Sequence, residues 1–477
     1  MAVTYLHGIE TVELMAGIQP ISTVKSSVIG LIGTADNADV TLFPLNTPVV
    51  IFSNAIKANA LGTAGTLLDA VNAMFSQGAP LIVVVRVATG ASQAQSWSNL
   101  IGSPVARTGV WAFLNSRSVL GIVPKILVAP GWTSDRPTNG VSGVSVTAGG
   151  TGYVSATTTV TFSAPPAGGR VATGAAQVVG GAVTGITIID PGFGYTGSVP
   201  TITIGGVGTG AVATATLGHV ANPVGVALAS IVDRLRAVAY LDGPGTNYAD
   251  AYTYRQDYGS QRVMVIDPGV LHYDTVSSGY ITAPASAYAA GMQAQIDIKN
   301  GFWFPFSNNV IGNIGGSARP IDWAIDDPNS EANALNQQDI TTIIHDAGYR
   351  FWGLRGCGTD PLWAQLSVRR TADMVYEILE LALRDVLDKP FSYNLLGRIV
   401  QSVNAYLKQL TARGALIGGK CWIDPSQNTP TTFANGELIV NFDLEPAASL
   451  EHLIFQASRN PNYYTGFVEN FATTIRN

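Results

Sequence analysis

An alternation of strand-like and helix-like segments runs along most of this chain and is interrupted once, between residues 139 and 218. That block holds 19 glycines and 15 threonines but only two charged residues, Arg170 and Asp190. Its short Thr/Val runs lie between glycine-rich turns, which is typical of β-structure. Deleting the block would join a strand-like run, 125–131, to the run PVGVALASIVDRLRAVAYLDGP, which reads as a helix followed by a strand, and restore a βαβ unit. The sequence therefore predicts an all-β domain inserted into a surface loop, where insertions are tolerated.

The block also repeats itself. GGTGYVSATTTVTF (149–162) matches PGFGYTGSVPTITI (191–204) at an offset of 42 residues. Two copies are fewer than a solenoid usually needs, so a compact β-domain is the better interpretation.

Outside the block, residues 18–138 and 219–388 show the pattern of a layered α/β core. The run PLIVVVRVA, residues 80–88, is almost wholly apolar, as expected for a strand buried on both faces of a parallel sheet. A long helix is predicted at about residues 367–388, where Lys389-Pro390 ends it.

Residues 389–460 are predicted to form a smaller C-terminal α+β domain. An apolar stripe there indicates a second helix, for which Gly414 is well placed as the C-cap; the stripe comprises Leu396, Ile399, Val400, Val403, Leu407 and Leu410. Three strand-like runs follow: ALIGGKCWID (415–424), ELIVNFDL (437–444) and HLIFQAS (452–458). In the second of them Leu438, Val440, Phe442 and Leu444 alternate with polar residues.

Both ends of the chain are strand-like without an obvious partner in the sequence. The N-terminal segment is residues 1–17, and its apolar residues are Tyr5, Leu6, Ile9, Val12 and Leu14. The C-terminal segment is residues 461–477, and its apolar residues are Tyr463, Tyr464, Phe467, Val468 and Phe471. We expect both to be extended arms.

The composition points to a protein that works in an assembly. Apolar residues make up 47% of the chain and charged residues only 12%, so much of its surface should lie against other protein. The net charge of −6 argues against nucleic-acid binding. No signal peptide is visible, and the longest apolar run is far short of the roughly 20 residues that span a bilayer, so membrane insertion is not expected. Two cysteines give no disulfide framework, which fits a reducing cytoplasm.

The segment HDAGYRFWGLRGCGTDPLW, residues 345–363, places His345, Cys357 and Asp360 among glycines. Nothing around Cys357 matches a known nucleophile motif, so a structural turn is favoured over a catalytic site. The acidic run IDWAIDDPNSE lacks calcium-loop spacing, and the histidines lack the spacing of metal ligands. GxSxG, HExxH and Walker A motifs are absent. We therefore expect no enzyme, no cofactor and no metal site.

Several segments resemble, in the same order, those of the contractile tail sheath proteins of bacteriophages. They are HGIETVEL, ISTVKSSVIGLIGTADNAD and FPLNTPVVI near the start, then ASAYAAGMQAQID and GFWFPFSNNVIGNIGG, then GYRFWGLRGCGTDPLWAQLSVRRTADM, and finally GALIGGKCWIDPSQNT, GELIVNFDLEP and LEHLIF. Together they cover nearly everything outside residues 139–218, which depart from the shorter family members. Within the segment around Cys357, the resemblance assigns a structural role to Trp352, Arg355, Arg369 and Arg370.

The resemblance implies a subtilisin-like α/β fold without the protease triad. It also implies hexameric rings stacked helically around a tail tube, resting on a baseplate and closed by a tail terminator. Subunits assembled in the host cytoplasm would form the virion's tail sheath and contract to drive the tube through the host envelope. The terminal arms would add strands to a neighbour's C-terminal sheet, with Leu438, Val440, Phe442 and Leu444 as acceptors. The inserted domain would project from the outer face.

Two other classes stay open from the residues alone. One is a hydrolase built on the α/β core, for which loss of turnover on Cys357→Ser would be the sign. The other is a carbohydrate-binding or adhesive surface protein, suggested by the inserted β-domain.

Overall fold

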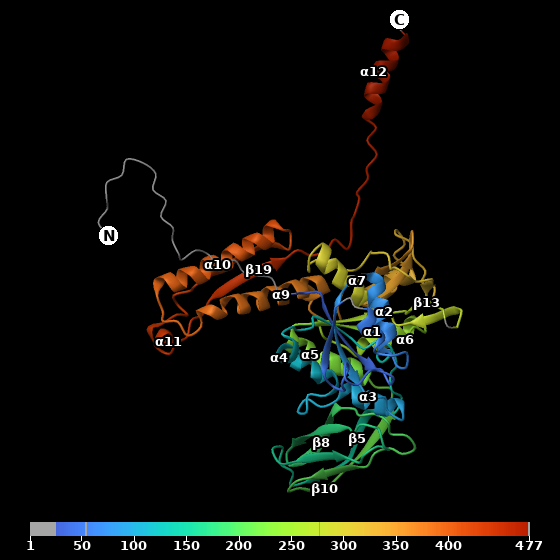
Figure 1. The fold of residues 1–477 in the computed structure, drawn as a ribbon, viewed down its shortest axis with the longest axis vertical. Helices are drawn as coiled ribbons and strands as arrows, with labels where there is room; N and C mark the ends of the chain where they lie inside the picture. Colours follow the sequence, from blue (N-terminus) through green and yellow to red (C-terminus); the bar gives the residue numbers. More distant parts are fainter. Residues whose placement is uncertain (1–24, 53–54, 276, 476–477) are drawn as a thin grey trace.

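The computed structural model describes residues 25–52, 55–275 and 277–475 of the chain (Figure 1). Its centre is an eight-stranded sheet in the order β17-β16-β12-β11-β4-β1-β3-β2. The strands are β1 (Val28–Thr34), β2 (Pro48–Phe52), β3 (Leu81–Val87), β4 (Ile126–Val128), β11 (Val238–Asp242), β12 (Val263–Ile266), β16 (Ile340–His345) and β17 (Tyr349–Trp352). Both edge strands, β2 and β17, pair antiparallel with their neighbours, and the six strands between them are parallel.

Helices cover both faces of this sheet. One face carries α1 (Ala55–Asn59), α2 (Leu67–Gln77) and α7 (Ala285–Lys299). The other carries α3 (Gln93–Ile101), η1 (Gly109–Asn115), α4 (Ser116–Leu120), α5 (Pro223–Leu235), α6 (Tyr248–Gln256) and α8 (Glu331–Gln337). In β1, Ile29 and Leu31 enter the first core and Val28 and Ile32 the second, which is why the strands lack polar alternation. A mixed α/β core is thus confirmed.

Close packing joins α2 and α7. A Cβ on Gly291 would lie 2.7 Å from the backbone oxygen of Met74, so only glycine allows this approach. Beyond α7, a small sheet of β13 (Val270–Asp274), β14 (Gly279–Ala283) and β15 (Gly316–Ser317) projects from the core (Figure 1).

The segment between β4 and α5 contains strands and turns only. Its strands are β5 (Gly140–Thr151), β6 (Thr159–Phe162), β7 (Thr173–Val179), β8 (Ala182–Asp190), β9 (Ile202–Gly205) and β10 (Thr209–Gly218). They form the lower body in Figure 1, which we call the insert. The insert's ends lie side by side, because the Val220 amide donates to the Pro137 carbonyl at 2.9 Å.

The sequence repeat is a structural repeat. β5, β6 and β7 come from the first copy and β8, β9 and β10 from the second, and each strand pairs across copies: β5 with β10, β6 with β9, β7 with β8. Thr161 lies opposite Thr203, its equivalent at the 42-residue offset, so a pseudo-twofold axis passes between them.

Each copy of the repeat contains a Gly-x-Gly-Tyr turn whose backbone conformation requires the two glycines. Gly150 and Gly152 have φ values of 63° and 78°, and the equivalent Gly192 and Gly194 have 59° and 85°, a region that L side chains rarely adopt. The tyrosine that follows is buried in both copies, and its hydroxyl accepts from a backbone amide, at 2.8 Å from Ala172 to Tyr195 and at 3.3 Å from Ala211 to Tyr153.

The C-terminal part consists of α9 (Leu366–Ala382), η3 (Leu383–Val386), α10 (Tyr393–Ala412), β18 (Leu416–Trp422), α11 (Pro430–Ala434) and β19 (Asn441–Pro446). A separate core lies between α9, α10 and the antiparallel pair β18–β19; it includes Val375, Ile378, Val403, Leu407 and Leu416. Gly414 has a φ of 79° just after α10, as expected for the glycine that ends a helix.

Three expectations for the C-terminal residues are wrong in this chain. Residues 437–440 are not part of a strand, because the Asn428 side chain takes both the amide and the carbonyl of Ile439, each at 2.9 Å. Of the predicted acceptor residues, only Phe442 and Leu444 therefore lie in β19, whereas Leu438 and Val440 precede it.

The predicted strand at residues 452–458 has no regular structure, and the predicted extended arm 461–477 holds a helix, α12 (Tyr463–Ile475). In the single chain this segment has no sheet to join, and it forms the helix that the spacing of its apolar residues also allows. Tyr464, Phe467, Val468 and Phe471 have helical spacing, and all are exposed in the single chain. Residues 1–17 lie outside the described residues, so the N-terminal arm and its residues Tyr5, Leu6, Ile9, Val12 and Leu14 stay predictions.

Candidate inter-subunit site

In the segment 345–363, Cys357, His345 and Asp360 each have a structural environment. Cys357 is fully buried in the core, and burial raises the pKa of its thiol to about 12. His345 is exposed and stacks on Tyr349 with ring centroids 4.5 Å apart, while the Asp360 carboxylate accepts from the Leu362 amide at 3.0 Å and begins the short helix η2 (Pro361–Trp363). Each of the three residues is engaged in local structure.

We expect Cys357 to be inert in the folded protein. Because its thiolate is disfavoured and no solvent reaches it, iodoacetamide at pH 8 should leave Cys357 unmodified, and the same reagent in urea should alkylate it. Peptide mass spectrometry distinguishes the two states. Rapid alkylation of Cys357 in the native protein would contradict this prediction and reopen the enzymatic interpretation.

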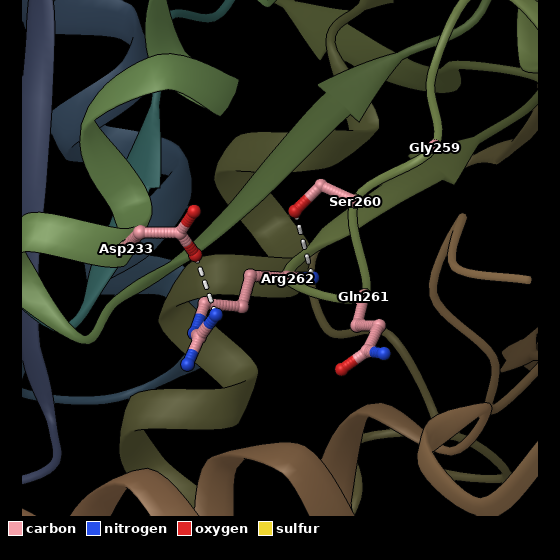
Figure 2. Close-up of a pocket in the computed structure, with 5 residues that line it drawn as sticks. All are labelled: Asp233, Gly259, Ser260, Gln261 and Arg262. Atoms are coloured by element: carbon pink, nitrogen blue, oxygen red, sulfur yellow. Dashed lines mark hydrogen bonds and ion pairs between the residues drawn. The ribbon is translucent and has the colours of Figure 1, made fainter. Parts of the chain in front are cut away.

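A shallow depression of about 500 Å³ is lined by Asp233, Gly259, Ser260, Gln261 and Arg262 (Figure 2). Figure 2 shows Arg262 turned toward Asp233, and the Ser260 hydroxyl accepts from the Arg262 amide at 3.2 Å. The guanidinium is also held by Asp373 through two bonds of 2.7 Å. The only cation lining the depression is thus committed to structure.

Within the described residues, no group of three or more His, Cys, Asp or Glu side chains is placed to hold a metal ion. Over residues 25–52, 55–275 and 277–475, no helix is both long and apolar enough to cross a membrane.

One face of α9 is attached to the α/β core by ion pairs. Arg370 binds Asp297 of α7 at 2.6 and 3.1 Å, and both side chains are almost fully buried. Asp373 binds Arg262, and Glu377 binds Lys125, whose pKa is lowered by burial although Glu377 acts to raise it.

The opposite face of α9 packs in the C-terminal core through Met374, Val375, Ile378 and Leu379. α9 therefore connects the two parts of the molecule, and we call it the strut. One face makes apolar contacts with the C-terminal part, and the other forms ion pairs with the α/β core.

Arg369 and Trp352 are placed by aromatic contacts. The guanidinium of Arg369 lies 4.2 Å from the centre of the Trp363 ring and pairs with Asp373 at 2.7 Å. Trp352 packs edge-on against Trp323 with ring centroids 5.8 Å apart.

Arg355 helps to hold the start of the C-terminal arm. Its guanidinium binds both carboxylate oxygens of Glu451, at 2.9 and 3.0 Å. Beside it, the Gln365 amide group exchanges two hydrogen bonds with the backbone of Ser449, at 2.7 and 3.0 Å. We call these four residues the arm clamp. It fixes the chain against the body just before residue 452.

Beyond the clamp the arm projects away from the body and ends in α12 (Figure 1). Its side chains are exposed wherever the structure describes them from residue 452 onward, and the backbone bonds around Tyr464 and Thr465 stay within the arm. Large apolar residues are among them, with Ile454 67% and Phe455 85% exposed.

The β18–β19 sheet offers matching free edges. It has two strands, so among the described residues each strand has one unpaired edge. Ile417, Trp422 and Phe442 are exposed on it. Unpaired edges of this kind accept strands from other chains.

The tail sheath protein of Burkholderia phage BcepMu is 32% identical to this chain over 97% of this chain and 98% of its own length. The chain belongs to the phage tail sheath protein family. Family membership makes it a structural component of a contractile phage tail, and thus of the virion, and not an enzyme.

Other comparisons agree. The tail sheath protein of Escherichia phage P2 is 28% identical over 97% of this chain and 98% of its own length. Three family profiles match: "Tail sheath protein Gp18 domain III N-terminal region" at residues 26–87, "Phage tail sheath protein central domain" at 211–357 and "Phage tail sheath C-terminal domain" at 358–458. Residues 88–210, which include most of the insert, match none of these three profiles.

Solved sheath structures share the fold. The helical sheath of the anti-feeding prophage in its contracted state aligns over 96% of this chain and 100% of its own, with a TM-score of 0.60 at 17% identity. The sheath complex of an extracellular contractile injection system, PVC, also contracted, aligns over 97% and 100% with a TM-score of 0.56 at 16% identity.

Sequence reasoning selected the arginines of this sheath protein but missed their partners. Asp297 and Glu451 lie far along the chain from Arg370 and Arg355, and no local pattern links them. A signal did exist on α9, where the charged residues Arg370, Asp373, Glu377 and Glu380 recur at helical spacing opposite the apolar stripe. It indicates a helix packed on both sides.

Proposed function

We propose that this chain polymerises as stacked hexameric rings around a tail tube and contracts to drive the tube through the host envelope during genome delivery. The main observation is that an exposed, apolar C-terminal arm begins at residue 452, directly after the arm clamp. The β18–β19 sheet, which ends shortly before the clamp, has unpaired strand edges among the described residues. Chains in the solved structures of the helical sheath and of the baseplate of the anti-feeding prophage share this fold, which supports self-assembly in association with a baseplate. Subunits made in the host cytoplasm would join the tube, baseplate and tail terminator there.

The connections between subunits would be strands exchanged by the arms. In the C-terminal arm we assign the donor strand to residues 452–456, because residues 463–475 are helical. The N-terminal arm, residues 1–17, would be a second donor, so the β18 and β19 edges of an acceptor could each receive one strand.

The energetics suit controlled assembly. An arm forming about five ladder bonds at about 1 kcal/mol each gains roughly 5 kcal/mol. Ordering the same residues costs about 1–2 kcal/mol apiece, so one arm alone roughly breaks even. At low protein concentration subunits should stay largely dispersed until a baseplate and tube hold several of them together, after which the contacts reinforce one another; high concentration should favour assembly of the purified chain by mass action.

We propose, too, that the core is subtilisin-like in topology alone. Its doubly wound parallel sheet with helices on both faces supports this relation. The likeness would concern the fold and not the chemistry, since function depends on the residues of a site and not on the fold that carries it.

We place the insert on the outside of the sheath. It lies at the end of the molecule away from the β18–β19 sheet (Figure 1). It is also docked on the core: Phe193 packs edge-on against Trp97 of α3 with centroids 5.6 Å apart, and the Gly168 carbonyl accepts from the Ser98 hydroxyl at 2.9 Å. The insert should therefore move rigidly with the core.

The adhesive alternative gains little support from the insert. Sugar-binding surfaces commonly use exposed aromatic rings and polar groups. Here the four aromatic residues, Tyr153, Phe162, Phe193 and Tyr195, are all buried, and the two charged residues pair with each other at 2.6 Å.

Electron microscopy of the purified chain, beside a variant whose residues 139–218 are replaced by a short Gly/Ser linker, tests the proposal. We expect rings or tubes from both, because the insert's ends already touch. Phe193→Ala, which loosens the insert but keeps it, is the matched control and should also assemble. Parent protein that stays monomeric at every concentration contradicts the proposed polymer. Tubes from the parent and Phe193→Ala but not from the folded deletion would make the insert part of the lattice.

A further inference from the structure

The α12 helix carries an aromatic face with no partner. Tyr464, Phe467, Val468 and Phe471 follow helical spacing, and each is 58–67% exposed. The rings are already arranged as one surface: Phe467 and Phe471 stack at an interplanar angle of 12°, and Tyr464 meets Phe467 edge-on. An apolar stripe of this width is typical of a helix that packs against another surface.

The chemistry of α12 selects a protein surface. Between residues 463 and 475 the only charged residue is Glu469. Helices that lie on membranes carry Lys and Arg on their polar face, and α12 contains neither residue type. An apolar groove of another protein requires no such charge.

The position of α12 selects which protein. Only residues 457–462 separate it from the donor strand at 452–456. Six residues span at most roughly 20 Å, so pairing of that strand with an acceptor sheet holds α12 close to the same acceptor. Exposed apolar side chains are available there, on the β18–β19 sheet (Ile417, Trp422) and near the start of α10 (Leu387, Phe391, Tyr393).

We propose that α12 docks as a helix, through its aromatic face, on the C-terminal domain of the second copy of this chain that accepts the donor strand. The inference rests on the proposed function and deepens it, because the arm then makes two contacts of different kinds. The strand brings the helix to its site, so the second contact forms at high effective concentration. Docking of α12 adds burial of apolar surface to the donor strand, whose hydrogen bonds alone only offset the entropy lost when the strand is ordered.

Substitutions on opposite sides of α12 test the proposal. Phe467→Asp places a charge in the aromatic face, and Asn470→Asp adds the same charge off that face as the matched control. Sedimentation across protein concentration, with sulfate to strengthen apolar burial, measures the concentration at half-assembly. We expect Phe467→Asp to raise it at least about 30-fold, as for loss of a buried aromatic ring, and Asn470→Asp to leave it within about twofold.

A third variant distinguishes helix from strand. Gly466 lies within α12, and a Cβ added there would meet nothing within 4 Å. Gly466→Ala therefore favours the helix and should lower the half-assembly concentration by up to about fivefold. Binding as a strand would give no such gain.

Cross-linking from a photoreactive phenylalanine analogue at position 467 identifies the acceptor. Links to the C-terminal domain of a second copy are expected. Links within one chain, or unchanged assembly of Phe467→Asp while the parent polymerises, would overturn the docking and leave the strand exchange standing. If Ile454→Pro and Phe467→Asp are both silent in a polymerising parent, the proposed role of the arm fails as well.

Discussion

Ending the chain at Glu451 should abolish polymerisation while leaving the free energy of unfolding unchanged within about 0.5 kcal/mol. The removed residues make no contact that holds the body together: their described side chains are exposed, and the clamp bonds at Ser449 and Glu451 are kept. Polymerisation should need them, because they contain the proposed donor strand and α12. Urea unfolding measures the first effect and electron microscopy the second.

A full-length chain with residues 452–475 replaced by Gly/Ser separates arm sequence from chain length. It should behave like the truncation. A truncation that unfolds more easily would mean that the arm packs on its own body, and normal tubes from either variant would contradict the role of the arm.

Asp297→Ala should destabilise the folded chain by about 3–5 kcal/mol, because it leaves the Arg370 guanidinium buried without its counter-charge. The loss should be larger than for an ordinary ion pair, since Asp297 also accepts from the Gln293 side chain at 2.7 Å and its side chain is fully buried. Denaturant unfolding followed by circular dichroism measures the change.

Asp385→Ala is the matched control, since it breaks a partly exposed pair with Arg398 and should cost at most about 1 kcal/mol. Replacing Asp297 and Arg370 together by Leu and Met should recover much of the loss, because neither charge is then left alone. Equal effects of Asp297→Ala and Asp385→Ala would show that the α9 junction does not depend on this pair.

Sequence patterns predicted the elements whose burial is set by near neighbours. The run 80–88 is apolar because β3 is covered on both faces, and the stripe from Ile399 to Leu410 is the buried side of α10. The insert was visible through composition alone, because tight turns with positive φ require glycine and leave little room for charge.

The errors came from segments whose structure depends on a partner. Residues 463–475 suit either a strand or a helix, and without a sheet edge the helical hydrogen bonds form within the segment itself. β19 begins later than alternation suggests because Asn428, outside the strand, binds the backbone of Ile439. The ion pairs of α9 join residues far apart in the sequence, so no window of residues could reveal them.

The arm clamp has a mechanical consequence. In chain order β19 ends at Pro446, the clamp holds Ser449 and Glu451, and the arm follows. If the arm binds a neighbouring subunit as proposed, tension along it reaches Arg355 and Gln365 before it reaches β19. Arg355 follows the edge strand β17 and Gln365 directly precedes α9, so the load passes into the central sheet and the strut. Without the clamp, the same pull would act on the end of β19 and open the two-stranded sheet one hydrogen bond at a time. The four clamp residues thus protect the β18–β19 sheet from a force that acts on the arm.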